Sequence, residues 1–200
     1  MSLVGISIPI FFLGLMLKWA FAIQFPILPD SGRIDLIEYS IPRVTNFMTI
    51  DAALAGEWGG MVDALRHLVL PGIALGTIPL AIIMRITRAS VVDVLNEDYV
   101  RTARAKGLPE LKVVLGHALR NAAVPIVTVI GVGIALLIGG VVVTETVFNI
   151  PGLGRLTVDA VLARDYPTVQ AVIMLFSVAY VLVNLVIDLL YTVLDPRIRY

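Results

Sequence analysis

Four apolar stretches, each about as long as a membrane is thick, constrain this chain more than any other feature of its sequence. They cover residues 3–23, 68–84, 122–143 and 171–194. A helix needs about 20 apolar residues to cross a hydrocarbon layer of about 30 Å. No backbone amide can stay unpaired in lipid, and the stretches lack the alternation of barrel strands, so we predict four membrane-spanning helices. The first stretch has no basic segment before it and is too long for a signal peptide, so we expect it to be retained.

The composition agrees with a membrane protein. Of the 200 residues, 58% are hydrophobic and 15% are charged, whereas about 25% are charged in an average soluble domain. Basic and acidic residues number 15 each, so the net charge gives no long-range attraction to nucleic acid. The chain has no cysteine, which excludes disulfides and thiolate metal sites. The sequence therefore predicts an all-α, polytopic transmembrane helix bundle, formed as a single domain over residues 1–200 in a lipid bilayer.

The charges of the loops predict the orientation of the bundle, because Lys and Arg accumulate on the cytoplasmic side of a membrane. Residues 85–120 contain seven basic and four acidic residues, and two further arginines follow the fourth stretch. Residues 24–66 contain three basic and six acidic residues. We therefore expect a multi-pass protein with a cytoplasmic loop over about residues 88–120 and a cytoplasmic C-terminus. The loops at residues 24–66 and 144–170 are expected outside.

Small residues at a spacing of four predict close helix packing in the second and third stretches. Gly72 and Gly76 form one such pair, and Gly131, Ala135 and Gly139 form a longer stripe. We expect neighbouring helices to approach along these faces.

The loop between the second and third stretches has the signals of two short helices. Asn96 is a capping residue, and the two acids after it suit the positive end of a helix. Gly107 stops this helix, and Pro109 starts an amphipathic second one that leads into the third stretch. Val100, Ala103 and Gly107 fall on one side of the first helix. A narrow apolar strip of this kind suits a partner's groove, so we predict that the strip docks on another protein.

The sequence of this loop, NEDYVRTARAKGLPELKVVLGHALRNAAVP at residues 96–125, is one of several distinctive blocks. The others, in order, are PDSGRID at residues 29–35, LPGIALGTIPLA at 70–81, TETVFNIPGLGR at 144–155, RDYP at 164–167 and DPRIR at 195–199. Together they resemble the permease subunits of ABC importers, and more narrowly the dipeptide, oligopeptide and nickel branch of that family. The blocks stand in the family's order over nearly the whole chain, so the resemblance is specific.

In that family, a signature of Glu-Ala-Ala, three residues and Gly marks the helix that docks on the ATP-binding subunit. Here the signature falls on Arg101, Thr102, Ala103 and Gly107, with Arg101 in place of the Glu. Arg120 stands in place of the family's later proline, and both departures favour the peptide branch. The resemblance assigns coupling to the ATP-binding subunit to nine residues. These are Glu97, Asp98, Tyr99, Arg101, Thr102, Ala103, Arg104, Lys106 and Gly107.

The resemblance implies a permease subunit of an ABC importer that forms half of a translocation pathway for peptides. The resemblance places this subunit in the cell (inner) membrane. Its implied partners are two ATP-binding subunits, a homologous second permease subunit and an extracytoplasmic substrate-binding protein. Full subunits of the family have six spans, so we expect about the first third of a full subunit to be missing from this sequence. The branch also carries nickel chelates, glutathione and opines, so a permease for nickel or another small solute stays open as an alternative.

The sequence shows no site for chemistry of its own and no assignable substrate-binding residue. It has no G-x-x-x-x-G-K-[ST] phosphate loop, so we predict that the chain is not an enzyme and that a partner subunit hydrolyses ATP. His67 and His117 are separated by a predicted span and cannot share a metal, so no metal or other cofactor is expected. Lys18 either extends to the membrane surface or contacts substrate, and Glu145 either faces the pathway or caps a loop.

Two other classes of function stay open. A self-sufficient channel or secondary transporter would need ionisable groups or broken helices in the middle of the membrane, for which Lys18 and Asp188 are weak candidates. A structural scaffold would anchor a soluble partner through the loop at residues 88–120, but would not need the ordered blocks outside it. Stoichiometric binding of an ATPase subunit separates an importer permease from a channel, and substrate-dependent ATP turnover separates it from a scaffold.

Overall fold

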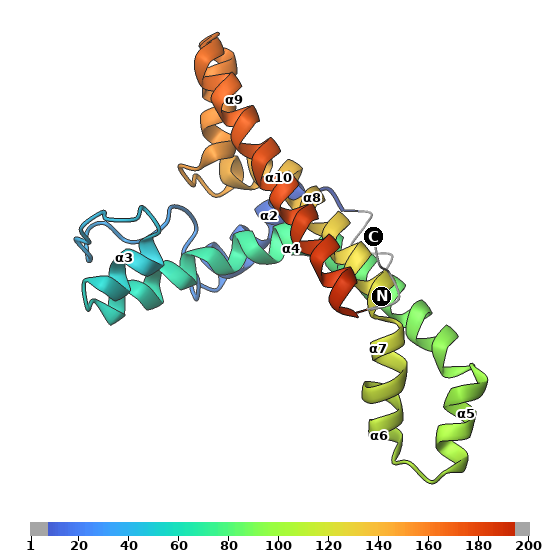
Figure 1. The fold of residues 1–200 in the computed structure, drawn as a ribbon. Helices are drawn as coiled ribbons and strands as arrows, with labels where there is room; N and C mark the ends of the chain where they lie inside the picture. The colour runs from blue at the N-terminus through green and yellow to red at the C-terminus, as the bar shows by residue number, and fades with distance from the viewer. Residues whose placement is uncertain (1–7, 195–200) are drawn as a thin grey trace. The chain divides into compact units, whose positions relative to one another are not determined.

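The computed structural model describes residues 8–194, which form helices joined by loops (Figure 1). Three of these helices are apolar and long enough to cross a membrane: α4 (Trp58–Leu95), α8 (Ala123–Val147) and α10 (Tyr166–Leu194). The shorter elements are α2 (Ile10–Lys18), the π-helical turn η1 (Trp19–Gln24), α3 (Met48–Leu54), α5 (Asp98–Ala105), α6 (Glu110–Lys112), the π-helical turn η2 (Val113–Ala118), α7 (Leu119–Asn121) and α9 (Leu153–Leu162). No strand occurs among the described residues, and the predicted all-α polytopic fold is confirmed.

The long helices extend past the apolar stretches that predicted them. α4 has 38 residues, or about 57 Å at 1.5 Å per residue, whereas its apolar stretch covers residues 68–84. α10 begins at Tyr166 rather than 171. Asp165 sets this start, because its carboxylate accepts hydrogen bonds from the N–H and the hydroxyl of Thr168 at 3.2 and 2.6 Å. Apolar composition marks where a helix can lie in lipid, but capping and turns decide where it ends.

Two predicted segments lie partly or wholly outside the described residues. Of the first predicted span, residues 3–7 are not described, and the described part consists of α2 and η1, an apolar helix shorter than the other three. The predicted cytoplasmic tail with Arg197 and Arg199 also lies outside the described residues.

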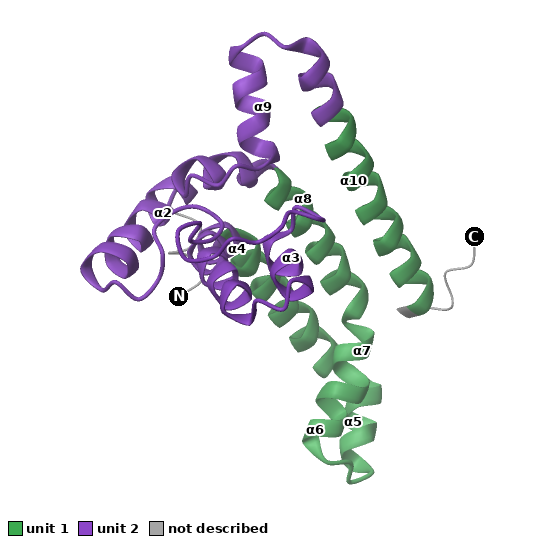
Figure 2. Cartoon of the chain, turned by 90° about the vertical axis from the view of Figure 1, so that its left-hand side faces the viewer, with its two compact units in different colours: residues 1–5, 78–138, 173–200 green, residues 6–77, 139–172 purple. Residues whose placement is uncertain are grey.

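The chain divides into two compact units (Figure 2). Of the described residues, unit 1 contains 78–138 and 173–194, and unit 2 contains 8–77 and 139–172. Unit 1 therefore holds α5 to α7 with parts of the three long helices. Unit 2 holds α2, η1, α3 and α9 with the remaining parts of the long helices.

In unit 1, a glycine brings α8 and α10 close together. A Cβ atom added at Gly131 would collide with the side chain of Ile187 in α10. The hydroxyl of Tyr191 in α10 donates a hydrogen bond to the hydroxyl of Thr128 in α8 at 2.7 Å. The close helix packing predicted at Gly131 is confirmed, because only a residue without a side chain leaves room for Ile187.

The other predicted small-residue positions behave differently. An added Cβ at Gly72, Gly76 or Gly139 would meet no described atom within 4 Å. The helix packing predicted at these three positions is therefore not found within the described part of the chain. A spacing of four shows which small residues share a face, but does not show whether a neighbouring helix covers it.

The core of unit 2 is centred on Phe148, which directly follows α8. Phe148 is 2% exposed and packs with Leu70 and Ala74 of α4. The ammonium of Lys18 in α2 donates a hydrogen bond to the carbonyl of Val147 at 3.1 Å and lies 5.8 Å from the centre of the Phe148 ring. Lys18 thus satisfies a carbonyl at the end of α8, which favours a structural role over contact with substrate.

We predict that Phe148→Ala lowers the free energy of unfolding of unit 2 by about 3–5 kcal/mol, the usual loss for a buried phenylalanine. The measurement is denaturant unfolding of the full-length subunit in detergent. Phe25→Ala is the matched control, because Phe25 is 62% exposed. Equal unfolding midpoints for the two variants would contradict the central position of Phe148.

Candidate functional site

Most of the predicted coupling loop, residues 88–120, forms a helical hairpin in unit 1 (Figure 1). Its predicted start is wrong, because residues 88–95 belong to α4. One arm is α5, and the other runs through α6, η2 and α7. Between the arms lies a small apolar core in which Val100, Ala103 and Val113 are 0%, 7% and 0% exposed. Val94, Leu95 and Leu108 are partly buried against this core. The loop is therefore an ordered element with its own packing.

The start of α5 differs from the prediction. Glu97 is the extended residue before the helix, and it makes no side-chain capping bond. Asn96, expected as the cap, donates its side-chain amide to the carbonyl of Val92 in α4 at 3.0 Å. The prediction that Asn96 caps α5 is wrong, because its side chain satisfies a carbonyl near the end of α4 instead.

The turn of the hairpin is set by Gly107 and closed by an ion pair. Gly107 has a φ of +74°, where any other residue except Asn or Asp would be strained. The guanidinium of Arg104 donates two hydrogen bonds to the carboxylate of Glu110, at 3.1 and 2.6 Å. These bonds lower the pKa of the Glu110 carboxyl and raise the pKa of Arg104. Both side chains are substantially exposed, so solvent screens the pair and the apolar core supplies most of the hairpin's stability.

Most predicted coupling residues lie on the exposed surface of the hairpin. The exposed ones are Glu97, Asp98, Tyr99, Arg101, Thr102, Arg104, Lys106 and Gly107. The hydroxyl of Tyr99 accepts a hydrogen bond from the side chain of Asn121 at 2.9 Å, which joins the two arms. Arg101 forms an exposed ion pair with Asp98, one turn earlier in α5, at 3.4 Å. This face therefore exposes charged and aromatic groups while the hairpin stays closed.

The apolar strip, by contrast, does not face outward. Val100 and Ala103 pack against Val113 in the other arm, and Gly107 forms the turn. The prediction that Val100 and Ala103 enter a partner's groove is wrong, because the hairpin buries their side of α5 within the chain. Helical spacing identifies an apolar face, but not the surface that covers it. Ala103 belongs to the packing that holds the two arms together.

We predict that Ala103→Glu opens the hairpin, because an ionised carboxylate cannot stay in an apolar core without a partner. Amide hydrogen exchange in α5 and η2 should become at least about tenfold faster, for a loss above about 1.4 kcal/mol. Thr102→Glu is the matched control, since it adds the same charge to the exposed neighbouring position. Unchanged exchange in Ala103→Glu would contradict the packing of this residue.

In unit 2, a buried carboxylate fixes the loop before α3. Asp51 is 1% exposed and accepts hydrogen bonds from the N–H groups of Val44, Thr45 and Asn46 at 3.3, 2.7 and 3.0 Å. It also accepts one from the Thr45 hydroxyl at 2.7 Å, and this bond is the main cause of the lowered pKa of Asp51. The bonds hold Asn46 at a φ of 64°, a conformation that few non-glycine residues adopt.

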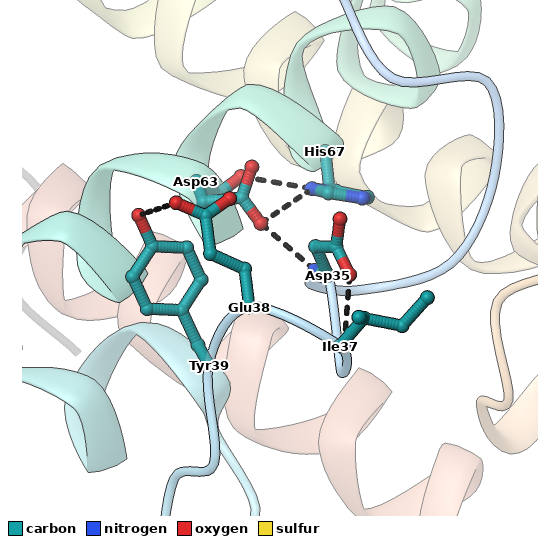
Figure 3. A network of polar contacts seen from close by, with 6 residues as sticks. All are labelled: Asp35, Ile37, Glu38, Tyr39, Asp63 and His67. Carbon is teal, nitrogen blue, oxygen red and sulfur yellow. Dashed lines mark hydrogen bonds and ion pairs between the residues drawn. The ribbon is translucent and has the colours of Figure 1, made fainter.

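A second carboxylate, Asp63 in α4, holds the preceding part of the same loop (Figure 3). It accepts a hydrogen bond from the N–H of Asp35 at 2.8 Å and lies 3.4 Å from Nδ1 of His67, which is also 2.9 Å from the Asp63 carbonyl oxygen. Nearby, the hydroxyl of Tyr39 donates to Glu38 at 3.0 Å, which raises the pKa of Tyr39. His67 thus belongs to a polar network, and within residues 8–194 no three side chains are grouped to hold a metal ion.

The loop after α8 is held by Glu145. The Glu145 carboxylate accepts a hydrogen bond from the N–H of Arg155 at 2.8 Å, and its carbonyl accepts one from the N–H of Ile150 at 2.9 Å. The guanidinium of Arg155 in turn donates to the side chain of Asn149, which has a φ of 50°. The loop cap is therefore the interpretation of Glu145 that the structure supports.

These fixed segments line three adjoining hollows in unit 2. Their volumes are about 650, 420 and 220 Å³. Arg33 and Asn46 line all three, Arg43 lines the second, and Arg155 and Asp159 line the first. No motif in the sequence indicated a cavity here. Two of the distinctive sequence blocks, at residues 29–35 and 144–155, supply Arg33, Asn149 and Arg155 to the walls, but they indicated a family and not a cavity.

We predict that Asp51→Asn loosens residues 44–47. The NH₂ group of the new side-chain amide is a donor, and it would lie against main-chain N–H groups, which are also donors. The wild-type carboxylate has a lowered pKa when folded, so it stabilises the loop above the ordinary aspartate pKa of about 3.9. This stabilisation is lost as the pH falls through the lower folded pKa. Hydrogen exchange, corrected for intrinsic rates, should show protection of Asn46 at pH 7 in the wild type only. Equal protection in the variant at pH 7 would contradict the role of Asp51.

The fold and the hairpin define a multi-pass helical membrane protein with an ordered loop between two of its long helices. The chain belongs to the family of binding-protein-dependent transport system inner membrane components, whose model matches residues 1–200. It is 52% identical to the di/tripeptide transport system permease protein DppB of Pseudomonas aeruginosa and 50% identical to the dipeptide transport system permease protein DppB of Escherichia coli K12. These matches cover 100% of this chain and 59% and 60% of the two relatives.

The glutathione transport system permease protein GsiC of Escherichia coli O1:K1 is 45% identical, over 98% of this chain and 55% of the relative. The chain thus spans about 60% of the length of the two DppB relatives. The resemblance to importer permeases that the sequence blocks indicated is confirmed.

Proposed function

We propose that this chain belongs to a permease subunit of an ABC importer and forms half of a translocation pathway for short peptides. The observation that carries the proposal is the closed hairpin between α4 and α8, whose exposed side presents eight of the nine predicted coupling residues, all except Ala103. The relatives reported above are named for dipeptides, tripeptides and glutathione, which favours peptides over nickel.

In this proposal, hydrolysis of ATP takes place in separate subunits. Two ATP-binding subunits would bind the hairpin of this permease and that of a homologous second permease subunit, and an extracytoplasmic binding protein would deliver substrate. The excess of basic residues at 85–120 supports a cytoplasmic hairpin and C-terminus, with the loops of residues 24–66 and 144–170 outside. The first apolar stretch, α4, α8 and α10 would be four spans of one domain.

The hairpin is well placed to pass movement to the long helices. α4 ends at Leu95 and α5 begins at Asp98, while α7 ends at Asn121 and α8 begins at Ala123. Both arms are therefore joined to a long helix by very short connections. Because the apolar core and the Arg104–Glu110 pair hold the arms together, closure of the ATP-binding subunits on α5 would move α4 and α8 as well.

A self-sufficient channel or secondary transporter is less well supported. Of the two ionisable candidates, Lys18 bonds to the end of α8 and lies beside Phe148 in the core of unit 2. Lys18 is therefore bonded within the protein and is not available to bind an ion or a substrate in a pathway. A channel or secondary transporter would need such ionisable groups.

The proposal predicts that Arg101→Glu weakens binding of the ATP-binding subunits. The Arg101 side chain is 71% exposed, so reversing its charge changes the docking face and spares the hairpin core. Like charges brought together at an interface cost several kcal/mol, so binding should fall at least about tenfold. The measurement is capture of the ATP-binding subunits by a tagged full-length subunit that is co-expressed with its partners.

Lys112→Glu is the matched control, because it makes the same charge reversal at an exposed position in the other arm. It should retain binding. Normal binding by Arg101→Glu would place docking away from α5, and equal losses in both variants would show only a general effect of charge. A wild-type subunit that captures no ATP-binding subunit would overturn the proposed function.

A further inference from the structure

We propose that the hollow of about 420 Å³ in unit 2 binds the C-terminal carboxylate of a peptide on its way to the translocation pathway. This inference rests on the proposed function. Arg33 and Arg43 line the hollow together with Asn46, Asn149, Ile34 and Met48. The volume falls in the usual range for small-ligand sites, about 300–1,000 Å³, and suits one or two residues rather than a long peptide.

The charge of this hollow is unbalanced. Two arginines line it, and no carboxylate does. Among the described residues, the arginines in ion pairs are Arg101, Arg104 and Arg155, so Arg33 and Arg43 are not among them. An anion bound in the hollow would therefore meet two positive residues and no negative one. The planar, forked geometry of a guanidinium group matches a carboxylate better than any other common biological anion except phosphate.

The lack of a counter-charge does not come from a shortage of acids nearby. Residues 24–66 contain six acids, and most of them bond to groups other than arginine. Asp51 and Asp63 accept hydrogen bonds from main-chain N–H groups, as Asp35 does from the N–H of Ile37. Glu38 accepts one from the Tyr39 hydroxyl. The fold thus uses its acids to hold the loop and leaves the two arginines available to a ligand.

The walls of the hollow are also held in place before any ligand binds. The N–H of Gly32, next to Arg33, donates to the carbonyl of Phe148 at 3.0 Å. Asn46 is fixed through the Asp51 carboxylate, and Asn149 through Arg155. Binding therefore would not have to order these segments, which favours affinity. The two asparagines add amide donors that suit a carboxylate, and Ile34 and Met48 add an apolar wall for a side chain.

The test uses the complete importer in liposomes with its binding protein, and measures transport of the dipeptide Ala-Ala and of its C-terminal amide. For each peptide, the rate with Arg33→Gln/Arg43→Gln is divided by the wild-type rate, so the binding protein's own preference cancels. Loss of charge-assisted hydrogen bonds should lower transport of the free acid about tenfold or more. Transport of the amide should change less than about twofold, because it presents no charge to the arginines.

Two further variants make the result specific. Arg33→Lys/Arg43→Lys keeps the charge but loses the forked guanidinium. Its transport of the free acid should lie between that of the wild type and that of Arg33→Gln/Arg43→Gln. Arg164→Gln removes an exposed arginine of unit 2 that does not line the hollow, and it should behave as the wild type. Equal loss for the acid and the amide would mean that the arginines contact the binding protein or hold unit 2, and would overturn the inference.

No loss for either peptide in Arg33→Gln/Arg43→Gln would also overturn the inference. These outcomes differ from failure of the proposed function, in which the wild-type importer would move neither peptide. That last result would overturn the function and this site with it.

Discussion

A helix that crosses lipid bonds its own backbone, but its ends leave N–H and C=O groups that need other partners. In this protein charged side chains supply many of those partners. Lys18 binds the last carbonyl of α8, and Glu145 binds the N–H of Arg155 at the start of α9. Asp165 binds the first turn of α10 in the same way. The chain therefore needs charge at the ends of its apolar helices although only 15% of its residues are charged.

The same kind of contact shapes the loops of unit 2. Asp51 and Asp63 bond to main-chain N–H groups of the long segment between η1 and α4. A carboxylate that accepts several such bonds is well satisfied and is not available to a guanidinium. This division explains why Arg33 and Arg43, which line the hollow of about 420 Å³, are not among the ion-paired arginines of the described residues. The hairpin of unit 1 is stabilised differently, because apolar packing around Val100 and Val113 chiefly holds its arms together.

Local patterns predicted what local physics determines. Apolar length predicted the membrane helices, and the glycine at 107 predicted the turn of the hairpin, since both signals lie within a few residues of the structure they specify. The failures concern contacts between distant segments. The strip at Val100 and Ala103 was identified as a face, but its cover, Val113, lies in the other arm. The bond from Lys18 joins residues 129 positions apart, and no spacing rule reaches that far.

The hollow of unit 2 could not be predicted from the sequence, because it too depends on contacts between distant segments. Its walls come from residues near 33, 46 and 149, which separate loops bring together. Each arginine alone resembles an ordinary surface charge, and only their shared cavity suggests a ligand. The hairpin of unit 1, by contrast, is continuous in sequence, so its turn and its family resemblance could be identified before the structure. Its start could not, because α4 continues to Leu95, past the predicted loop start at residue 88.

The central claim is that the exposed side of α5 contacts an ATP-binding subunit, and cross-linking from single cysteines tests it most directly. The chain has no cysteine of its own, so each introduced thiol reports one position. In the assembled importer, we expect Arg101→Cys to cross-link to an ATP-binding subunit. Leu54→Cys, at an exposed position of α3, should give no such product. A working importer that cross-links from Leu54→Cys, or fails to do so from Arg101→Cys, would contradict the account.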